Sequence, residues 1–505
     1  MTHPYPSAKR RNLNLFSLKT LEGVLSIFAL ILILKFLIFG FFIPAIADEA
    51  VHIHEGYLAS VGLRPDVDFY LQYHPLKVYL YGALLSMIKN PFLFIIIVRT
   101  LNLALLVFLA FMINLLYTRL TGLRSALPGL IFILGSSVSN FAMHNAQIKP
   151  DFLSLLFFVC AIILVQSYLT KKRIINLLLA ALFVALSGMT SSKIIFPLIG
   201  LNLWLVYQNR KKGVLRLLLE PLILNLPLLV SFMIYISLTG GLSYYLYNHV
   251  VLVSGISPFS MGLKNLIIDS FKEAIQGPFM DLFILLTLYL LIFDRKRLFA
   301  ANKKSLIILS LLLMAFQLMG NLIMNLRIGY LTPLLIPIAL LIVPYLKRLD
   351  KRTEKTLISL AWLAFVFYLS WMGYIHFKIL SHMFRPGDIS SGYRTIFEQA
   401  KDYNCLNITS KDYYFDFYAY FFHPIFVRDA GYYYVASKID RLENYENLTD
   451  SYLRKATLMV TPDKIRIMNP PYQVAASLDK YAQYTNASFE PVCEGMYMRR
   501  KPGQN

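Results

Sequence analysis

Apolar residues form long, almost uninterrupted stretches over most of this chain, and short polar segments separate the stretches. The first stretch, residues 21–43, exceeds the about 20 residues that cross the hydrocarbon core of a bilayer as a helix. Such stretches predict membrane-spanning helices rather than the amphipathic helices of a soluble domain. We predict about eleven spans, with a range of nine to thirteen, at residues 21–43, 100–117, 126–141, 152–169, 174–186, 194–207, 217–238, 279–293, 306–324, 328–345 and 357–377.

The apolar stretch at residues 76–97 decides the orientation of every later span. Lys77, Lys89 and Pro91 interrupt it, so we predict interfacial helices in the first outer loop instead of a crossing. Every basic cluster between later spans then falls on the side of the basic segment 1–20, which the positive-inside bias places in the cytoplasm. A single crossing would put them all outside. These clusters are Arg119 and Arg124, residues 171–173, 210–216, 295–304 and 347–355.

The last part of the chain, residues 378–505, is polar and rich in tyrosine. Its short helical and strand-like patterns alternate, which predicts a small extracytoplasmic α/β domain. The predicted organisation is therefore a cytoplasmic segment 1–20, a membrane domain 21–377 that contains the first outer loop 44–99, and the domain 378–505. In the tail we predict helices at residues 392–403, 448–455 and 472–481 and strands at 406–409, 425–428 and 458–461.

Two of the three cysteines, Cys405 and Cys493, stand near the two ends of this polar tail. Outside the cytoplasm they are candidates for a disulfide that ties the domain together, because oxidising compartments favour such bonds. Two unrelated free thiols are the alternative.

Composition excludes a soluble globular protein. Of the 505 residues 57% are hydrophobic, and the mean hydropathy is +0.57. The net charge of +21 resembles that of a nucleic-acid-binding protein, but the Lys and Arg residues lie in short loops between apolar stretches. We therefore assign this charge to membrane orientation and predict no nucleic-acid partner.

An acidic pair, Asp48 and Glu49, stands immediately after the first predicted span. A carboxylate at membrane depth is costly to keep there, which makes this pair a candidate functional site. The plainer interpretation is that the pair only solvates a helix end. Other charged residues on the predicted outer side favour the functional interpretation: Asp66, Asp68, His74, Lys77, Lys149, Asp151, Lys193, Arg327 and the neighbouring Tyr330.

Several of these residues also have ordinary explanations. Lys149 and Lys193 are long enough to snorkel to headgroups, and Asp66 and Asp68 are suited to capping a short surface helix. A metal site is open: His52, His54 and Glu55 are candidate ligands, but their spacing matches no strong metal motif. We predict no required cofactor, with a divalent metal as an alternative.

A series of short motifs, in order along the chain, resembles the GT-C class of integral-membrane glycosyltransferases. The first outer loop, with Asp48-Glu49, residues 62–69 and His74-Pro75-Leu76, is similar to that of the branch holding protein O-mannosyltransferases and the aminoarabinose transferases of lipid A. Residues 149–151, 191–193 and 327–337 resemble later motifs of the same branch, so the resemblance covers roughly residues 20–345. The chain departs from the pattern at Leu76, where the branch has proline, and at Lys149, where it has arginine.

This resemblance implies a glycosyltransferase that takes a hexose or pentose from a polyprenyl phosphate at the outer face. It implies an inverting reaction in which Asp48 is the base and Glu49 assists. The implied substrate-binding positions are Asp66, Asp68, His74, Lys77, Lys149, Asp151, Lys193, Arg327 and Tyr330.

The acceptor remains open among lipopolysaccharide or another glycolipid, a glycan and a protein. We expect a bacterial inner membrane. The alternatives to a glycosyltransferase are a transporter or flippase for lipid-linked sugars and an enzyme of the O-antigen ligase type.

Overall fold

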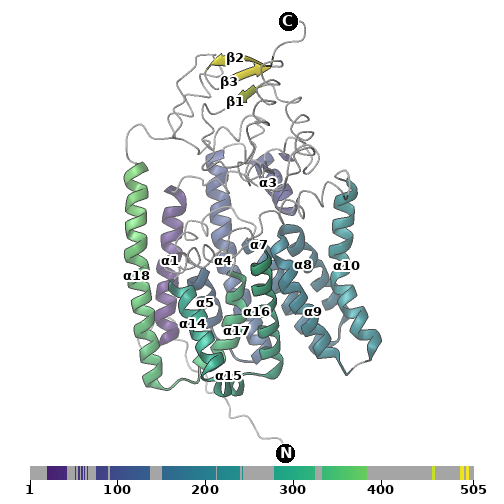
Figure 1. The fold of residues 1–505 in the computed structure, drawn as a ribbon, viewed down its shortest axis with the longest axis vertical. Coiled ribbons are helices and arrows are strands. Elements are labelled where there is room, and N and C mark those ends of the chain that lie inside the picture. The colour runs from purple at the N-terminus through teal and green to yellow at the C-terminus, as the bar shows by residue number, and fades with distance from the viewer. Residues whose placement is uncertain are drawn as a thin grey trace, which may run out of the picture.

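The computed structural model describes residues 20–42, 75–88, 91–136, 151–211, 213–238, 278–324, 332–383, 458–460, 489–493 and 496–499, with positions 52, 55–56, 59–60, 62, 65 and 242 between them. This part of the chain is a bundle of roughly parallel and antiparallel helices, with a small sheet beyond one end of the bundle (Figure 1).

Each of the eleven predicted apolar stretches coincides with a helix. The helix ends differ from the predicted ends by a few residues in most cases, because polar residues that flank an apolar stretch continue the helix. These helices are α1 (Leu21–Phe42), α4 (Pro91–Thr121), α5 (Leu127–Ser136), α7 (Asp151–Lys171), α8 (Ile174–Thr190), α9 (Ile195–Asn209), α10 (Val214–Leu238), α14 (Pro278–Ile292), α16 (Lys304–Met324), α17 (Leu335–Leu346) and α18 (Lys351–Met383). Three short elements accompany them: α3 (Pro75–Met87), the 3₁₀ turn η1 (Ser192–Ile194) and α15 (Arg295–Ala301).

The chain is a helical membrane protein, but the described residues supply fewer full-length spans than predicted. Leu93–Thr121 within α4, together with α7 and α10, are long and apolar enough to cross a membrane. The pair α15 and α16, bent by 118°, adds a fourth if it counts as one span. Apolar helices such as α5, α8 and α14 have only 10 to 17 residues, which is short for a bilayer of about 30 Å. The predicted number of about eleven is not reached among the described residues.

The stretch 76–97 is divided between two helices. Its first half is α3, whose 13 residues are too few to cross a bilayer and which packs against α4 and α8. Its second half is the start of α4, so the prediction that this half forms an interfacial helix is wrong. Pro91 opens α4 because proline suits the first helical position, and nothing breaks the helix from there to Thr121.

The core of the bundle surrounds α17, which is buried on nearly all sides. Eleven of its twelve residues are buried, as expected for a helix that is apolar all round. It packs against α5 and α16, and close approach to α5 depends on Gly135. A methyl group added to Gly135 would come within 2.5 Å of the Leu335 side chain, so a larger residue would force Leu335 to move.

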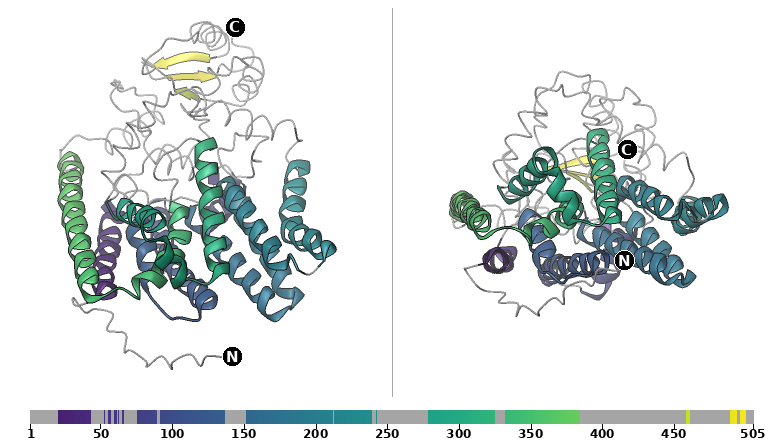
Figure 2. Two further views of the ribbon diagram at one scale, coloured as in Figure 1. Left: turned by 60° about the horizontal axis from the view of Figure 1, so that its bottom comes forward. Right: turned by 90° about the horizontal axis from the view of Figure 1, so that it is seen from below.

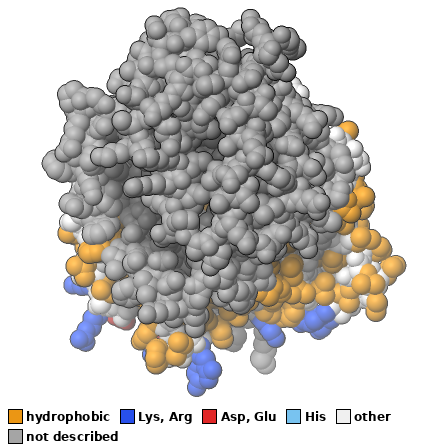
Figure 3. Space-filling view, turned by 45° about the horizontal axis from the view of Figure 1, so that its top comes forward, with side chains coloured by type: hydrophobic (Ala, Val, Ile, Leu, Met, Phe, Trp, Pro, Cys, Tyr) orange, Lys and Arg blue, Asp and Glu red, His pale blue; other side chains and the backbone are white. Residues whose placement is uncertain are grey.

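The basic loops of the described part meet at one end of the bundle. Lys347 donates a hydrogen bond to the Arg124 carbonyl at 2.6 Å, and the Ala126 amide donates to Glu22 at 2.7 Å. Burial lowers the pKa of the Lys347 amine, while the nearby carboxylate of Glu22 opposes that shift. These contacts join the start of α1, the loop before α5 and the turn before α18. Figure 3 shows Lys and Arg side chains beyond the apolar side chains at this edge of the molecule.

The described part of the tail forms a three-stranded antiparallel sheet of order β1-β3-β2, from β1 (Leu458–Val460), β2 (Phe489–Cys493) and β3 (Met496–Arg499). β1 confirms the predicted strand 458–461. β2 and β3 were not predicted, since they are short and Pro491 argues against a central strand; β2 is an edge strand, where proline is tolerated. The other predicted tail elements and Cys405 lie outside the described residues, so the α/β fold and the disulfide stay predictions.

Candidate functional site

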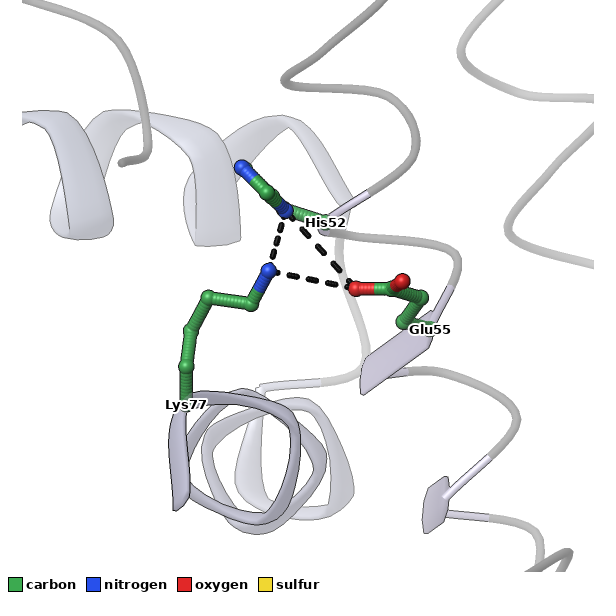
Figure 4. Close-up of polar contacts among 3 residues, drawn as sticks. All are labelled: His52, Glu55 and Lys77. Atoms are coloured by element: carbon green, nitrogen blue, oxygen red, sulfur yellow. Dashed lines mark hydrogen bonds and ion pairs between the residues drawn. The ribbon is translucent and has the colours of Figure 1, made fainter. Parts of the chain in front are cut away.

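A buried cluster of three ionisable side chains lies where the first outer loop contacts α3. Lys77 Nζ is 3.1 Å from Glu55 Oε2, and His52 Nδ1 is 3.7 Å from the same oxygen (Figure 4). Lys77 Nζ also contacts His52 Nδ1 directly. The three residues are only 1% to 3% exposed. His52 and Glu55 are three positions apart, which places them on one side of a helical turn, facing Lys77 on α3.

The chemistry of this cluster follows from its burial. A charged group away from water is tolerated only when it is paired, and Lys77 and Glu55 pair each other. A lysine ammonium has no acceptor, so in this contact His52 Nδ1 accepts and the ring proton is assigned to Nε2. The cluster is therefore a buried polar contact that holds the loop on the helix.

Two glycines allow the loop to approach α3 this closely. A Cβ on Gly56 would lie 2.7 Å from Tyr81 Cβ, and a Cβ on Gly82 would lie 3.0 Å from the Gly56 carbonyl oxygen. Both distances are below normal van der Waals contact. The backbone of the loop and the backbone of α3 are thus in direct contact beside the Lys77 cluster.

We expect Lys77→Met to destabilise the protein by about 3–5 kcal/mol, because it leaves the buried Glu55 carboxylate without its cation. The double variant Lys77→Met with Glu55→Gln should recover part of this loss, since no charge is then stranded. Thermal unfolding in detergent measures both, with the exposed Lys296→Met as the matched control. An unchanged unfolding temperature for the single variant would show that the pair contributes nothing to folding.

A second ion pair joins Asp151 and Lys193. Lys193 Nζ is 3.0 Å from Asp151 Oδ1, and the two side chains are 29% and 30% exposed. Asp151 is the first residue of α7, where the positive end of the helix dipole favours a carboxylate. Lys193 lies in η1, between the end of α8 and the start of α9. The pair therefore sits at the ends of three neighbouring helices.

A small apolar cavity lies about one helical turn from this ion pair. Leu155 follows Asp151 by four residues on α7, and Pro197 follows Lys193 by four residues, so both elements that carry the pair also line the cavity. The remaining lining comes from α7, α16 and the start of α17: Phe158, Leu313, Gln317, Pro333, Ile336 and Pro337.

The ion pair and the basic loops lie at opposite ends of the bundle. α7 runs from Asp151 to the basic segment at Lys171, and Arg119 at the end of α4 donates to Ser167 at 2.5 Å, near that basic segment. Asp151 and Lys193 therefore lie at one end of these helices, and the basic residues at Arg119 and Lys171 lie at the other; Figure 1 shows how α4 and α7 run through the bundle.

The predicted site residues divide into those the structure places and those it leaves open. It places Asp151 with Lys193, and it places Lys77, a predicted substrate-binding residue, with His52 and Glu55, two predicted metal ligands. Within the described ranges, no group of three or more His, Cys, Asp or Glu residues is arranged to hold a metal. The remaining predicted residues lie outside the described part and stay predictions: Asp48, Glu49, His54, Asp66, Asp68, His74, Lys149, Arg327 and Tyr330.

Two polar contacts inside the helices were not predicted. Tyr168 donates to Glu220 at 2.6 Å in a buried contact between α7 and α10, and Asn209 also contacts Glu220. Lys35 on α1 lies beside Tyr368 on α18. The signal available in the sequence was a single charged residue within an apolar stretch, which marks a position of interest in membrane helices.

Comparisons with protein-family models, with curated proteins and with solved structures found no match to this chain. The short motifs and the geometry described above are therefore what bears on function.

Proposed function

We propose that this protein is a membrane glycosyltransferase that moves a sugar from a polyprenyl phosphate to an acceptor hydroxyl at the outer face of the membrane. The observation that carries the proposal is the Asp151–Lys193 ion pair at the end of the bundle opposite the basic loops. The Lys193 ammonium suits the anionic head of a polyprenyl phosphate, and the exposed apolar faces of the helices suit its tail. The resemblance to GT-C enzymes supplies the class of reaction.

The proposed orientation places the basic loops in the cytoplasm, as the positive-inside bias requires. Lys193, Asp151 and the domain 378–505 then lie on the extracytoplasmic side of the membrane, which we propose to be a bacterial inner membrane. We propose that the apolar helices shorter than a bilayer cross it together with flanking residues, which gives the eleven-span architecture.

In the proposed mechanism the cations act on the leaving phosphate. Negative charge grows on the phosphate as the anomeric C–O bond breaks, and Lys193, with Arg327 and Lys149 from neighbouring outer turns, stabilises that charge. Asp151 holds the Lys193 ammonium in place at 3.0 Å. Because phosphate is a good leaving group, this step needs no general acid.

Asp48 is the proposed base. As the acceptor oxygen forms its bond to the anomeric carbon, its proton passes to the Asp48 carboxylate, and the configuration at that carbon inverts. Glu49, Asp66 and Asp68 orient the acceptor and the sugar. Asp48 precedes His52 by four residues, so the buried contact of His52 with Lys77 anchors the segment that follows the base.

A transporter for lipid-linked sugars is the second candidate. Lys35 and Glu220 favour it, because transporters place ionisable residues inside their helices. The two functions differ in whether a glycosidic bond is formed.

The experiment that separates them is mass spectrometry of lipopolysaccharide, other glycolipids and exported proteins from cells with and without the gene. We expect one class to lose the mass of one sugar when the gene is absent. No change in any class would contradict the transferase and favour transport.

A further inference from the structure

Lys35 is a lysine on the seam between α1 and α18, in the half of α1 that lies away from the basic end. It lies 14 positions after Leu21 in the 22-residue helix α1, a rise of about 21 Å from the basic end. Its Nζ is 3.5 Å from the Tyr368 hydroxyl and 4.5 Å from the centre of the Tyr368 ring. A cation at such depth is costly and marks a functional position.

Among the residues that the structure describes around Lys35, none carries a balancing negative charge. Throughout the described ranges, no carboxylate oxygen lies within 4.0 Å of Lys35 Nζ. Tyr368, buried to 1% exposure, offers a neutral hydroxyl and the face of its ring. These groups orient the ammonium but leave its charge for an anion to neutralise.

The seam is closed on the side of the basic end. Phe28 on α1 stacks on Phe365 of α18 with ring centres 3.9 Å apart, and Trp362 meets Phe28 edge to face at 4.8 Å. Phe28 lies two helical turns before Lys35. Packed rings therefore form the floor of the seam, and an anion reaches the ammonium from the lipid side or from the outer end.

The surface beside Lys35 is apolar and exposed. Leu34 is 47% exposed and Leu37 is 39% exposed on α1, and Val366 and Leu369 are exposed on α18. Lys35 itself is partly exposed, so its ammonium is accessible from this surface. Figure 2 shows α1 and α18 together at one edge of the bundle, away from α7, α8 and α9.

We propose that the α1–α18 seam binds the phosphate group of an anionic membrane phospholipid, with Lys35 as its cation and the acyl chains against Leu34 and Leu37. The chemistry of the seam indicates which lipid binds there. The ammonium of Lys35 suits an anionic headgroup, and the apolar surface beside it suits acyl chains. The buried Tyr368 hydroxyl accepts from the ammonium and orients it from the protein side. This site is separate from the Lys193 site and does not depend on the proposed transfer reaction.

The test uses full-length protein in a neutral maltoside detergent and native mass spectrometry with added phosphatidylglycerol, phosphatidylcholine or inorganic phosphate. We expect wild type to retain phosphatidylglycerol in preference to phosphatidylcholine. Lys35→Met should bind phosphatidylglycerol about tenfold more weakly, since a charge-assisted hydrogen bond is lost. Lys35→Arg should keep the binding, and Lys296→Met, which removes an exposed lysine at the basic end, should behave like wild type.

Several outcomes would overturn the proposal. Equal binding of phosphatidylglycerol to wild type and Lys35→Met would remove Lys35 from the site. A loss in Lys296→Met as large as in Lys35→Met would indicate unspecific attraction to surface charge. If wild type bound inorganic phosphate and retained neither lipid, the seam would be a site for free anions. Should Lys35→Met fail to fold, equal retention of the two lipids by wild type would still refute the lipid site.

Discussion

Asp48→Asn is expected to lower sugar transfer by about 10²–10⁴-fold while the protein still accumulates in the membrane. Asparagine keeps the size and polarity of the side chain but cannot accept the proton of the acceptor hydroxyl. Donor binding should change little, because the phosphate is held by cations from other outer turns. Transfer measured in isolated membranes, normalised to the amount of protein, gives the comparison.

The matched control for this variant is Glu49→Gln, which removes the neighbouring carboxylate. We expect a smaller loss, since Glu49 is assigned to orientation and Asp48 to proton transfer. Near-normal activity of Asp48→Asn would eliminate Asp48 as the base. A larger loss in Glu49→Gln than in Asp48→Asn would exchange the two roles.

Lys193→Met is expected to have the second largest effect, a loss of about 10²–10³-fold in the turnover rate. In the proposed mechanism the ammonium of Lys193 stabilises charge that develops on the departing phosphate, so its removal should affect the transition state more than the bound donor. Lys193→Arg should retain much of the activity because it keeps a cation near Asp151. Steady-state kinetics over a range of donor concentrations separates the turnover rate from the Michaelis constant.

Asp151→Asn tests whether the ion pair serves catalysis or folding. If Lys193 acts on the phosphate, this variant loses less activity than Lys193→Met, because the cation remains. Equal losses of activity together with equal losses of thermal stability would show that the pair is structural.

A rise in the Michaelis constant of Lys193→Met at an unchanged turnover rate would mean that Lys193 stabilises the ground state and the transition state equally.

The positions of the helices were predictable because apolar stretches in this chain end at polar or basic residues. The exception is the start of α4. The stretch 76–97 contains Lys89 two residues before Pro91, and its pattern reads as one interrupted segment. The proline instead begins a new helix of 31 residues. The number of membrane crossings was harder to predict from the sequence. Several helices of 10 to 17 residues are apolar enough to cross a bilayer but are short for its thickness.

The members of the site were predictable by residue type, but their partners were not. Asp151 and Lys193 were both expected at the outer side, yet they are 42 residues apart and only the packing of α7 against α8 and η1 pairs them. Lys77 was expected to bind substrate, and His52 and Glu55 were candidates for a metal. Their mutual contact depends on how closely Gly56 and Gly82 let the loop approach α3, which no local pattern reveals.

The most direct test of the account is mass spectrometry of purified protein in liposomes that contain a polyprenyl-phosphate sugar and the acceptor class found in cells. We expect wild type to convert the donor to free polyprenyl phosphate and to increase the acceptor mass by one sugar, and Asp48→Asn to do neither. A donor that stays intact while it crosses the bilayer would contradict the account.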